Sequence, residues 1–312
     1  MSIFISIASY EDPDLINTVK SAIDNANNPK NLYFGICLQY KKFPDLSFIP
    51  NHQKDIIMFD PENRPGISKV RFLIKSFYKN QDYFLQIDSH SRFLKNWDLI
   101  LIDNLKKLKE KYGQNSLISS NLTVNFHEGY HIKKHFNWIL LNELPVDFFL
   151  TNEIEQFTNE DNLKQECVYF KTQYAKGGFI FVDKEIIKNV DFDSYSNCLL
   201  EEPLLSFNFI MNGYDIYDVY PTPVIHDNRM YNNHLYKENY PAKSFTSSYK
   251  GDSDEDQYEA TKAFIYNKGI FSVKNAKRTP KDFWKEIGLQ NSFYRVKEKY
   301  DKMNIEKGEK NE

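Results

Sequence analysis

Short apolar runs alternate with amphipathic stretches through the first 120 residues of the chain. The apolar runs predict buried strands, at 3–7, 32–38, 56–59, 83–87 and 117–119. Apolar residues on one helical face predict helices between them, at 14–26, 68–78 and 97–111. Strands and helices that alternate in this way are typical of a doubly wound, mostly parallel sheet, because each parallel connection crosses over the sheet. We therefore expect an α/β fold whose ligands bind at the carboxyl ends of strands.

The segment from about 124 to 173 departs from this regular pattern. Its aromatic clusters and an acidic patch at 153–166 predict loops and short antiparallel strands. Beyond it, the pattern predicts a strand at 179–182, a helix from about 201 to 212, and two further strands, the second ending at His226. The second half of the fold should therefore contain a small antiparallel portion.

The chain is long enough for one large domain or two small ones. We predict a main domain over residues 1–240, built from two halves that meet near residue 125, and a C-terminal extension over 241–312. The extension contains a polar stretch rich in Gly, Ser and Asp at 244–256, which predicts a mobile loop. It also contains a helix start near residue 280, so we expect a C-terminal helical segment.

Composition and charge narrow the class of protein. Hydrophobic residues make up 41% of the 312 positions, enough for a substantial core, and the formal net charge of −3 gives no basic surface for nucleic-acid binding. No apolar run reaches the roughly 18 residues that would span a bilayer, although peripheral membrane association stays open. The first residues lack the pattern of a signal peptide, and the three cysteines have no metal-binding spacing. We therefore expect a cytoplasmic protein with free thiols.

The triplet Asp88-Ser89-His90 is the strongest candidate for chemistry in the chain. It directly follows the apolar run at 83–87. A carboxylate and an imidazole two residues apart, at the end of a buried strand, suit a divalent metal that holds a nucleotide diphosphate. His226 also follows a predicted strand and is the natural third ligand. The alternatives are a surface turn for the triplet and an ordinary structural histidine at His226.

Five short sequence blocks, spread over about residues 3 to 230, follow one another in the order found in a known protein family. They are Ile3 to Pro13, Tyr83 to Phe93 with Trp97 and Asp98, Gly177 to Phe179, Glu201 with Glu202, and Thr222 with Pro223 and His226. In this order they resemble the N-acetylglucosaminyltransferases that modify hydroxyproline in the eukaryotic cytoplasm, a family with relatives outside eukaryotes. The segment 66–71 keeps the family's glycine and arginine but differs between them, and the C-terminal third resembles the family only loosely.

The resemblance implies a GT-A fold and a metal-dependent glycosyltransferase. It implies a UDP-sugar donor, with UDP-GlcNAc as the expected one, and Mn²⁺ or Mg²⁺ as the cofactor. The sugar would pass, with retention of anomeric configuration, to a hydroxyl of a protein or glycan acceptor. Residues 1–125 would then form the nucleotide-binding half of the catalytic domain, and residues 126–240 would form the acceptor-side half.

The resemblance also implies roles for individual residues. Asp88, His90 and His226 correspond to the metal ligands. The residues expected to bind the donor lie at strand ends or on the helix before the metal motif, and they are Ala8, Ser9, Tyr10, Arg71, Ser89, Gly178 and Phe179. The expected catalytic residues are Glu202, Glu201 and Arg71. Asp12 is expected to cap the helix that follows it rather than to touch ligand.

Three of these roles have structural alternatives. Arg71 could reach the diphosphate or position the metal motif, or it could be an exposed helical arginine. Gly178 would allow close approach at a sugar pocket shaped together with Phe179, but both residues also fit an ordinary strand start. One of Glu201 and Glu202 could accept sugar hydroxyls or stabilise an oxocarbenium-like transition state, while the other favours the helix N-terminus. We expect Glu202 to face the site.

Two other functions would use the same residues. A non-catalytic UDP-sugar-binding protein would bind UDP with Mn²⁺ without turnover. A non-haem iron oxygenase would use the two histidines and Asp88 as a facial triad. Such oxygenases are usually built on antiparallel jelly-roll scaffolds, whereas the opening of this chain predicts β-α-β units. The transferase is therefore the favoured hypothesis.

Overall fold

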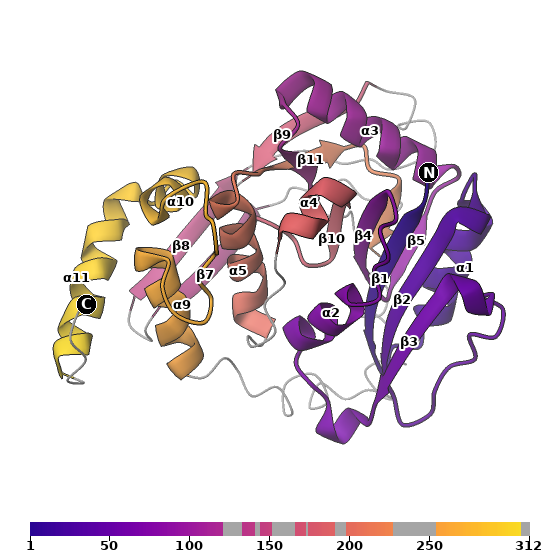
Figure 1. Ribbon diagram of the computed structural model, residues 1–312, viewed down its shortest axis with the longest axis horizontal. Coiled ribbons are helices and arrows are strands. Elements are labelled where there is room, and N and C mark those ends of the chain that lie inside the picture. The colour runs from indigo at the N-terminus through magenta and orange to yellow at the C-terminus, as the bar shows by residue number, and fades with distance from the viewer. Residues whose placement is uncertain are drawn as a thin grey trace.

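The computed structural model describes residues 1–120, 133–140, 144–151, 166–172, 174–190, 198–226 and 254–306, with only the backbone path for 133–140 and 144–151. Its centre is an eight-stranded sheet in the order β3-β2-β1-β4-β10-β6-β11-β9 (Figure 1). The strands of this sheet are β1 (Ile3–Tyr10), β2 (Leu32–Gln39), β3 (Lys54–Phe59), β4 (Tyr83–Asp88), β6 (Ser116–Ile118), β9 (Val168–Thr172), β10 (Phe179–Asp183) and β11 (Asp215–Tyr220). Most neighbours in the sheet run parallel, which confirms the predicted α/β class.

Helices cover both faces of the sheet (Figure 1). The helices α1 (Leu15–Asn25) and α3 (Trp97–Tyr112) pack on one face, and α2 (Ile67–Lys75), α4 (Lys184–Asn189) and α5 (Cys198–Met211) pack on the other. Each face of the sheet has its own hydrophobic core. Strand β4 contributes side chains to both cores, because successive side chains of a strand point to opposite faces. Leu85 and Ile87 belong to the core under α1 and α3, and Phe84 belongs to the core under α2 and α5.

The order of the strands brings distant segments to one edge of the sheet. Strand β1 pairs in parallel with β4, so that Ala8 lies opposite Asp88. Strand β10 runs antiparallel between β4 and β6, and its first residue, Phe179, lies opposite Ile87. Because β10 starts where β4 ends, the chain enters β10 beside Asp88.

Two small antiparallel sheets complete the strands. Strand β5 (Ser91–Phe93) pairs with β12 (Val224–His226), and β7 (Lys133–Leu140) pairs with β8 (Leu144–Thr151). The pair β7 and β8 falls in the segment where the sequence predicts short antiparallel strands. Strand β5 has no signal of its own in the sequence, since it is only three residues long and directly follows the turn at 89–90.

The C-terminal part of helix α5 buries apolar side chains on more than one side. Phe209, Ile210 and Met211 occupy successive positions, each rotated by about 100° on the helix, and all three are buried. A helix of this kind needs cover on both sides. One side contacts β11, and another contacts α9 (Asp254–Tyr266) and α10 (Pro280–Glu286), against which the last helix α11 (Gln290–Glu306) packs.

An aromatic cluster joins α5 to the C-terminal helices. The ring centroids of Phe207 on α5, Phe264 on α9 and Phe283 on α10 lie 5.0 to 5.4 Å apart. Trp284 Nε1 donates a hydrogen bond of 2.8 Å to the backbone oxygen of Phe264. The C-terminal helices therefore share one core with α5 and the sheet.

The predicted C-terminal extension is described in part. Residues 244–253 of the expected mobile loop lie outside the described residues, and residues 254–256 form the first turn of α9. Helix α10 begins at Pro280 with Thr279 as its cap, where the sequence predicts a helix start. The division into a catalytic domain and an extension stays a prediction.

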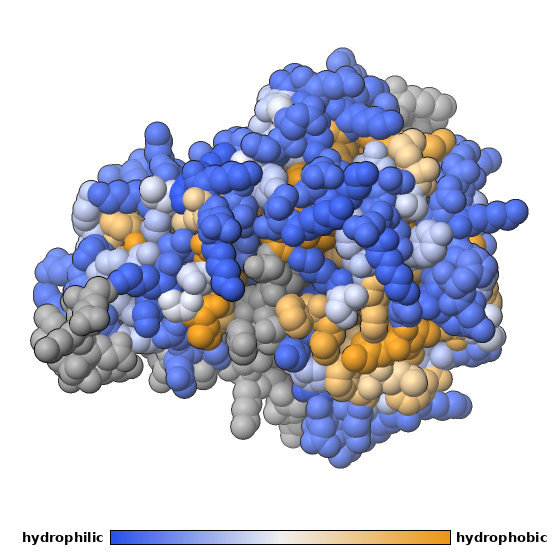
Figure 2. Space-filling view, viewed as in Figure 1, coloured by the Kyte–Doolittle hydropathy of each residue, from blue (hydrophilic) through white to orange (hydrophobic). Residues whose placement is uncertain are grey.

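In the view of Figure 2, an apolar area lies over α2 and β3. Met58 on β3 and Phe72 on α2 are 56% and 42% exposed. Among the described helices, none is long and apolar enough to cross a membrane. Cys37 is buried, Cys167 is partly exposed, and both are free thiols. Burial raises the pKa of Cys37 to about 12.

Phe264→Ala should lower the free energy of unfolding by about 3–5 kcal/mol, because it leaves a cavity where α5, α9 and α10 meet. The measurement is urea unfolding of the full chain. Tyr294 on α11 is 63% exposed and provides a matched aromatic control, since Tyr294→Ala should cost less than about 1 kcal/mol. Equally small effects of the two changes would show that the aromatic cluster does not hold the C-terminal helices to α5.

Candidate metal centre

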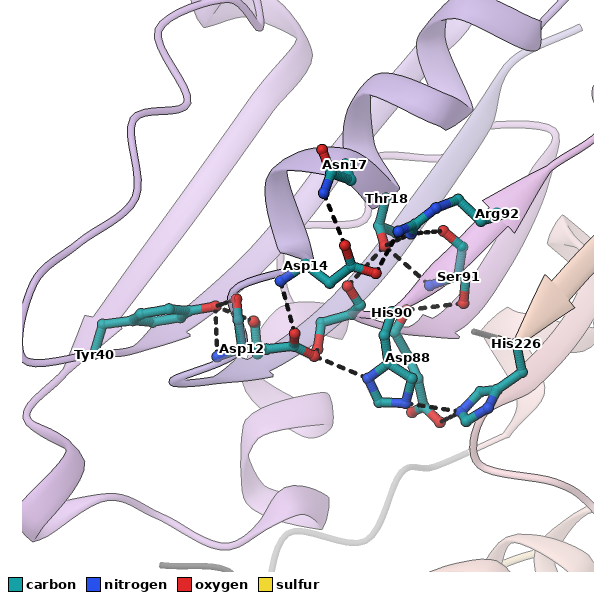
Figure 3. A network of polar contacts seen from close by, with 12 residues as sticks. Asp12, Asp14, Asn17, Thr18, Tyr40, Asp88, His90, Ser91, Arg92 and His226 are labelled. Atoms are coloured by element: carbon teal, nitrogen blue, oxygen red, sulfur yellow. Dashed lines mark hydrogen bonds and ion pairs between the residues drawn. The ribbon is translucent and has the colours of Figure 1, made fainter. Parts of the chain in front are cut away.

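Three side chains that bind metals well converge at the carboxyl end of β4 (Figure 3). Asp88 ends β4, His90 lies in the turn that follows, and His226 ends β12. The pairing of β12 with β5 sets His226 opposite Ser91, although His226 and His90 are 136 positions apart in the chain. The ligand atoms of the three residues lie within 4.8 Å of one another. The three predicted metal ligands therefore meet, and burial of His90 excludes an exposed surface turn.

The geometry of the cluster suits a divalent cation. His226 Nε2 lies 2.8 Å from His90 Nε2 and 3.2 Å from Asp88 Oδ2. The other nitrogen of His90, Nδ1, lies 2.8 Å from Asp12 Oδ2. A carboxylate only accepts hydrogen bonds, so Nδ1 carries the proton and a lone pair remains on Nε2 for a metal. Two imidazoles and a carboxylate form a donor set that can hold Mn²⁺, Fe²⁺ or Zn²⁺.

Arg71 is buried beneath this cluster and is not an exposed helical arginine. Its Nη2 donates to Asp88 Oδ1 at 3.0 Å, and its Nη1 donates to Glu201 Oε1. Burial alone would lower the pKa of Arg71, but the charges of Glu201 and Asp88 outweigh it and raise that pKa. Burial alone would raise the pKa of Asp88, but the hydrogen bond from His226 and the charge of Arg71 hold it well below its usual range. Arg71 thus keeps Asp88 charged and turns its Oδ2 toward His226.

Negative charge is in excess around the three ligands. The carboxylates of Asp88, Glu201 and Glu202 lie around the guanidinium of Arg71, and the carboxylate of Asp12 lies against His90. Burial lowers the pKa of His90, but the hydrogen bond to Asp12 and the charge of Asp88 outweigh it and raise that pKa. A bound divalent cation would offset the same negative charge, so the electrostatics of the cluster fit a metal.

Two glycines allow the start of β10 to approach these charges closely. A Cβ atom on Gly178 would lie 2.6 Å from Asp88 Oδ2, and one on Gly177 would lie 2.4 Å from Arg71 Nη1. Gln86 Nε2 donates to the backbone oxygen of Gly177, and Glu202 Oε1 accepts from its nitrogen, each at 2.8 Å. Only glycine fits at both positions, because any side chain would displace a charged atom.

Four of the predicted donor-binding residues lie in two different parts of the fold. Ala8, Ser9 and Tyr10 end β1 beside the metal ligands, and the Arg64 guanidinium lies 3.6 Å from the centre of the Tyr10 ring. Phe179, by contrast, is fully buried in the core under α1 and α3. This position agrees with the alternative interpretation of Phe179 as an ordinary strand residue.

The side chains of Ser89, Glu201 and Glu202 all contact other groups of the protein. Ser89 Oγ donates to Asp12 Oδ2. Glu201 is buried against Arg71, whereas Glu202 is partly exposed and accepts from Gly177. The expectation that Glu202 faces a ligand stays a prediction.

Helix α1 holds the loop that carries His90 (Figure 3). Thr18 Oγ1 donates to the backbone oxygen of Ser89 at 2.7 Å and accepts from the backbone nitrogen of Ser91 at 2.9 Å. Asp12 belongs to the same connection, although the sequence suggests only a helix cap. The expected cap is wrong in its position, because Asp14 is the N-cap residue of α1 and Asp12 lies two residues before it. Asp12 Oδ1 accepts from the backbone nitrogen of Asp14 at 2.9 Å, and its Oδ2 reaches His90. Strands β1 and β4 are neighbours in the sheet although β2 and β3 lie between them in the chain, so no local pattern in the sequence signals this contact.

Comparison with known proteins adds a family and a fold. The chain matches the family model described as "Glycosyltransferase (GlcNAc)" over residues 2–54 and 48–282. Among curated proteins, no sequence matches significantly.

Solved structures resemble the fold over almost the whole chain. GalNAc-T7 with UDP, GalNAc and Mn²⁺ has a TM-score of 0.56 and 13% identity, over 96% of this chain and 55% of that one. Residues 1–349 of TarS from S. aureus in complex with UDP-GlcNAc have a TM-score of 0.53 and 12% identity, over 95% and 72%. This chain therefore spans about half of the GalNAc-T7 chain, and at such identities the likeness shows the fold alone.

Arg71→Met should lower the free energy of unfolding by about 3–5 kcal/mol, because Asp88 and Glu201 then lose their buried positive partner. Adding Glu201→Gln to the same chain should restore part of the loss, since it removes one of the stranded charges. Urea unfolding of both single variants and the double variant measures the coupling. Strictly additive effects would show that Arg71 does not compensate Glu201.

Gly178→Ala should weaken the binding of Mn²⁺ by about 10-fold or more, because the new methyl group displaces Asp88 Oδ2. Electron paramagnetic resonance of free Mn²⁺ measures the affinity. Gly35→Ala is the control, since its Cβ would lie 2.3 Å from a ring atom of Phe4, far from the ligands. The control should lose stability and keep its Mn²⁺ affinity, and an unchanged affinity in Gly178→Ala would contradict the metal assignment.

Proposed function

Because the chain belongs to the GlcNAc glycosyltransferase family and has the GT-A fold, we propose that it transfers N-acetylglucosamine from UDP-GlcNAc to a hydroxyl of a protein or glycan. The observation that carries the proposal is the cluster of Asp88, His90 and His226 beside the end of β1. The ligands of the fold neighbours are compatible with it, since GalNAc-T7 was solved with UDP, GalNAc and Mn²⁺ and TarS with UDP-GlcNAc. An iron oxygenase finds no support in a mostly parallel sheet.

The reaction replaces one bond at the anomeric carbon by another. The bond to the UDP oxygen breaks, a bond to the acceptor oxygen forms, and the acceptor proton leaves with the UDP phosphate or passes to solvent. We propose that the configuration at this carbon is retained, which nuclear magnetic resonance of the product can test. Mn²⁺ or Mg²⁺ held by the three ligands would neutralise the leaving diphosphate as a Lewis acid.

The protein residues divide the remaining tasks. The last residues of β1, which are Ala8, Ser9 and Tyr10, would meet uridine at the carboxyl end of the strand. Arg71 acts as a positioning residue, because Asp88 and Glu201 engage both of its terminal nitrogens. Arg71 holds Asp88 by Oδ1, which leaves Oδ2 facing His226 and the proposed metal position.

Glu202 is the carboxylate proposed to meet the sugar or the acceptor. It is partly exposed, whereas Glu201 is buried in the pair with Arg71. A carboxylate at this point could accept sugar hydroxyls or stabilise positive charge that develops at the anomeric carbon. In this proposal residues 1–125 bind the nucleotide and residues 126–240 contribute the acceptor side, and the free thiols agree with a cytoplasmic location.

UDP release from a panel of UDP-sugars, with and without protein and glycan acceptors, tests the function. UDP-GlcNAc with Mn²⁺ should be turned over, and a chelator should stop the reaction. Asp88→Asn and His226→Ala should each lower the rate by about 1,000-fold or more, because each removes a ligand. His52→Ala, at an exposed histidine outside the site, should keep the rate.

The other outcomes separate the competing functions. Full activity of both ligand variants would remove the metal assignment. Binding of UDP with Mn²⁺ but no transfer or donor hydrolysis would identify a non-catalytic binding protein. Iron-dependent turnover without nucleotide binding would identify an oxygenase.

A further inference from the structure

We propose that Asp12 is a positioning residue of the metal centre. It fixes His90 in the tautomer and ring orientation that present Nε2 to the metal. The inference rests on the proposed function, because it concerns the same three ligands. It adds a fourth residue, Asp12, which contacts Nδ1 of His90 on the side of the ring opposite the proposed metal position.

The contact between Asp12 and His90 determines where the imidazole proton resides (Figure 3). Asp12 Oδ2 lies 2.8 Å from His90 Nδ1 and also accepts from Ser89 Oγ. Since the carboxylate cannot donate, the proton of the neutral ring belongs on Nδ1. The lone pair of Nε2 then points toward His226 Nε2, 2.8 Å away, and toward the position that a metal would occupy. Metal-bound histidines in general donate their second nitrogen to such a partner.

Asp12 is itself held rigidly. The Tyr40 hydroxyl accepts from the backbone nitrogen of Asp12 at 3.1 Å and donates to its backbone oxygen at 2.7 Å. Ser9 Oγ lies 2.5 Å from the same hydroxyl, which ties the group to the end of β1. The side chain of Asp12 is 6% exposed. Tyr40 therefore fixes the backbone of Asp12, while Asp14, Ser89 and His90 hold its carboxylate.

The two oxygens of Asp12 have separate tasks. Oδ1 accepts from the backbone nitrogen of Asp14, which is a local contact before α1. Oδ2 reaches His90, which lies 78 positions later in the chain. A residue that only started the helix would need the first contact alone. The second contact links the start of α1 to the metal ligand.

Asp12→Asn separates these tasks, because an amide has one accepting oxygen where the carboxylate has two. If the oxygen stays with Asp14, the NH₂ group faces His90 Nδ1 and moves the ring proton to Nε2, where it blocks the metal. If the oxygen turns to His90, the contact with Asp14 is lost and the interaction with His90 loses its charge. Either way Mn²⁺ binding weakens, by about 10- to 100-fold on the scale of such partners.

The experiment measures Mn²⁺ affinity of the full chain by calorimetry, without sugar nucleotide. It also records the tautomer of His90 in the metal-free protein by ¹H–¹⁵N correlation of the imidazole nitrogens. Wild type should show the proton on Nδ1, and Asp12→Asn should show a shift toward Nε2 together with weaker binding. Asp14→Asn is the matched control, because it removes the same charge two residues away and Asp14 contacts Asn17 and Arg92 rather than His90. Its affinity should stay within about threefold of wild type.

Each outcome decides a separate question. Wild type that does not bind Mn²⁺ overturns the metal centre of the proposed function. Wild type that binds Mn²⁺ while Asp12→Asn binds equally well, with an unchanged tautomer, overturns the role of Asp12 alone. Equal weakening in Asp12→Asn and Asp14→Asn would assign the effect to charge rather than to positioning, and would overturn it too. Thermal unfolding checks that the variants fold. Asparagine is used because it is nearly isosteric with aspartate, so Asp12→Asn is expected to fold even if Asp12→Ala would not.

Discussion

The buried guanidinium of Arg71 is the interaction on which the site depends. It lies on α2 and bridges Asp88 on β4 and Glu201 on α5, so three elements must take one arrangement before the charges are satisfied. Burying such charges costs free energy, which only good geometry offsets. The packing of α5 and the charges of the metal centre therefore stabilise each other. Gly177 and Gly178 complete the arrangement, because they leave room for both charged partners.

The mixed sheet explains how one site draws on distant segments. The parallel neighbours β1 and β4 end at the same edge, which brings Asp12 and Tyr10 near Asp88. The antiparallel strand β10 starts at that edge, and the pairing of β12 with β5 delivers His226. A purely parallel sheet would have placed the end of β10 there instead, with an acid, Asp183, in place of the glycines. The change of strand direction thus creates the space beside Asp88.

The sequence predicts the features whose signals are local. Apolar runs and helical spacing predict the β-α-β half, and a strand end marks Asp88 and His90 as candidate ligands. The remaining features depend on pairing and rotation, which no local pattern contains. The face on which Phe179 lies follows from the register of β10 against β4, since a shift of one residue would turn its side chain to the other face. Glu201 meets Arg71 because α5 begins at Cys198, three residues before the predicted start, and Asp12 meets His90 through a tertiary contact.

The dependence of α5 on the C-terminal helices has a consequence for biosynthesis. During translation, the strands that carry Asp88 emerge long before α9, α10 and α11. Until those helices dock, the apolar outer side of α5 remains exposed, and Glu201 lacks the packing that holds it at Arg71. Contacts between such distant segments form slowly, and exposed apolar surface is a target for chaperones. The candidate metal centre therefore assembles late in the maturation of this chain, even though Asp88, its first predicted ligand, lies within the first third.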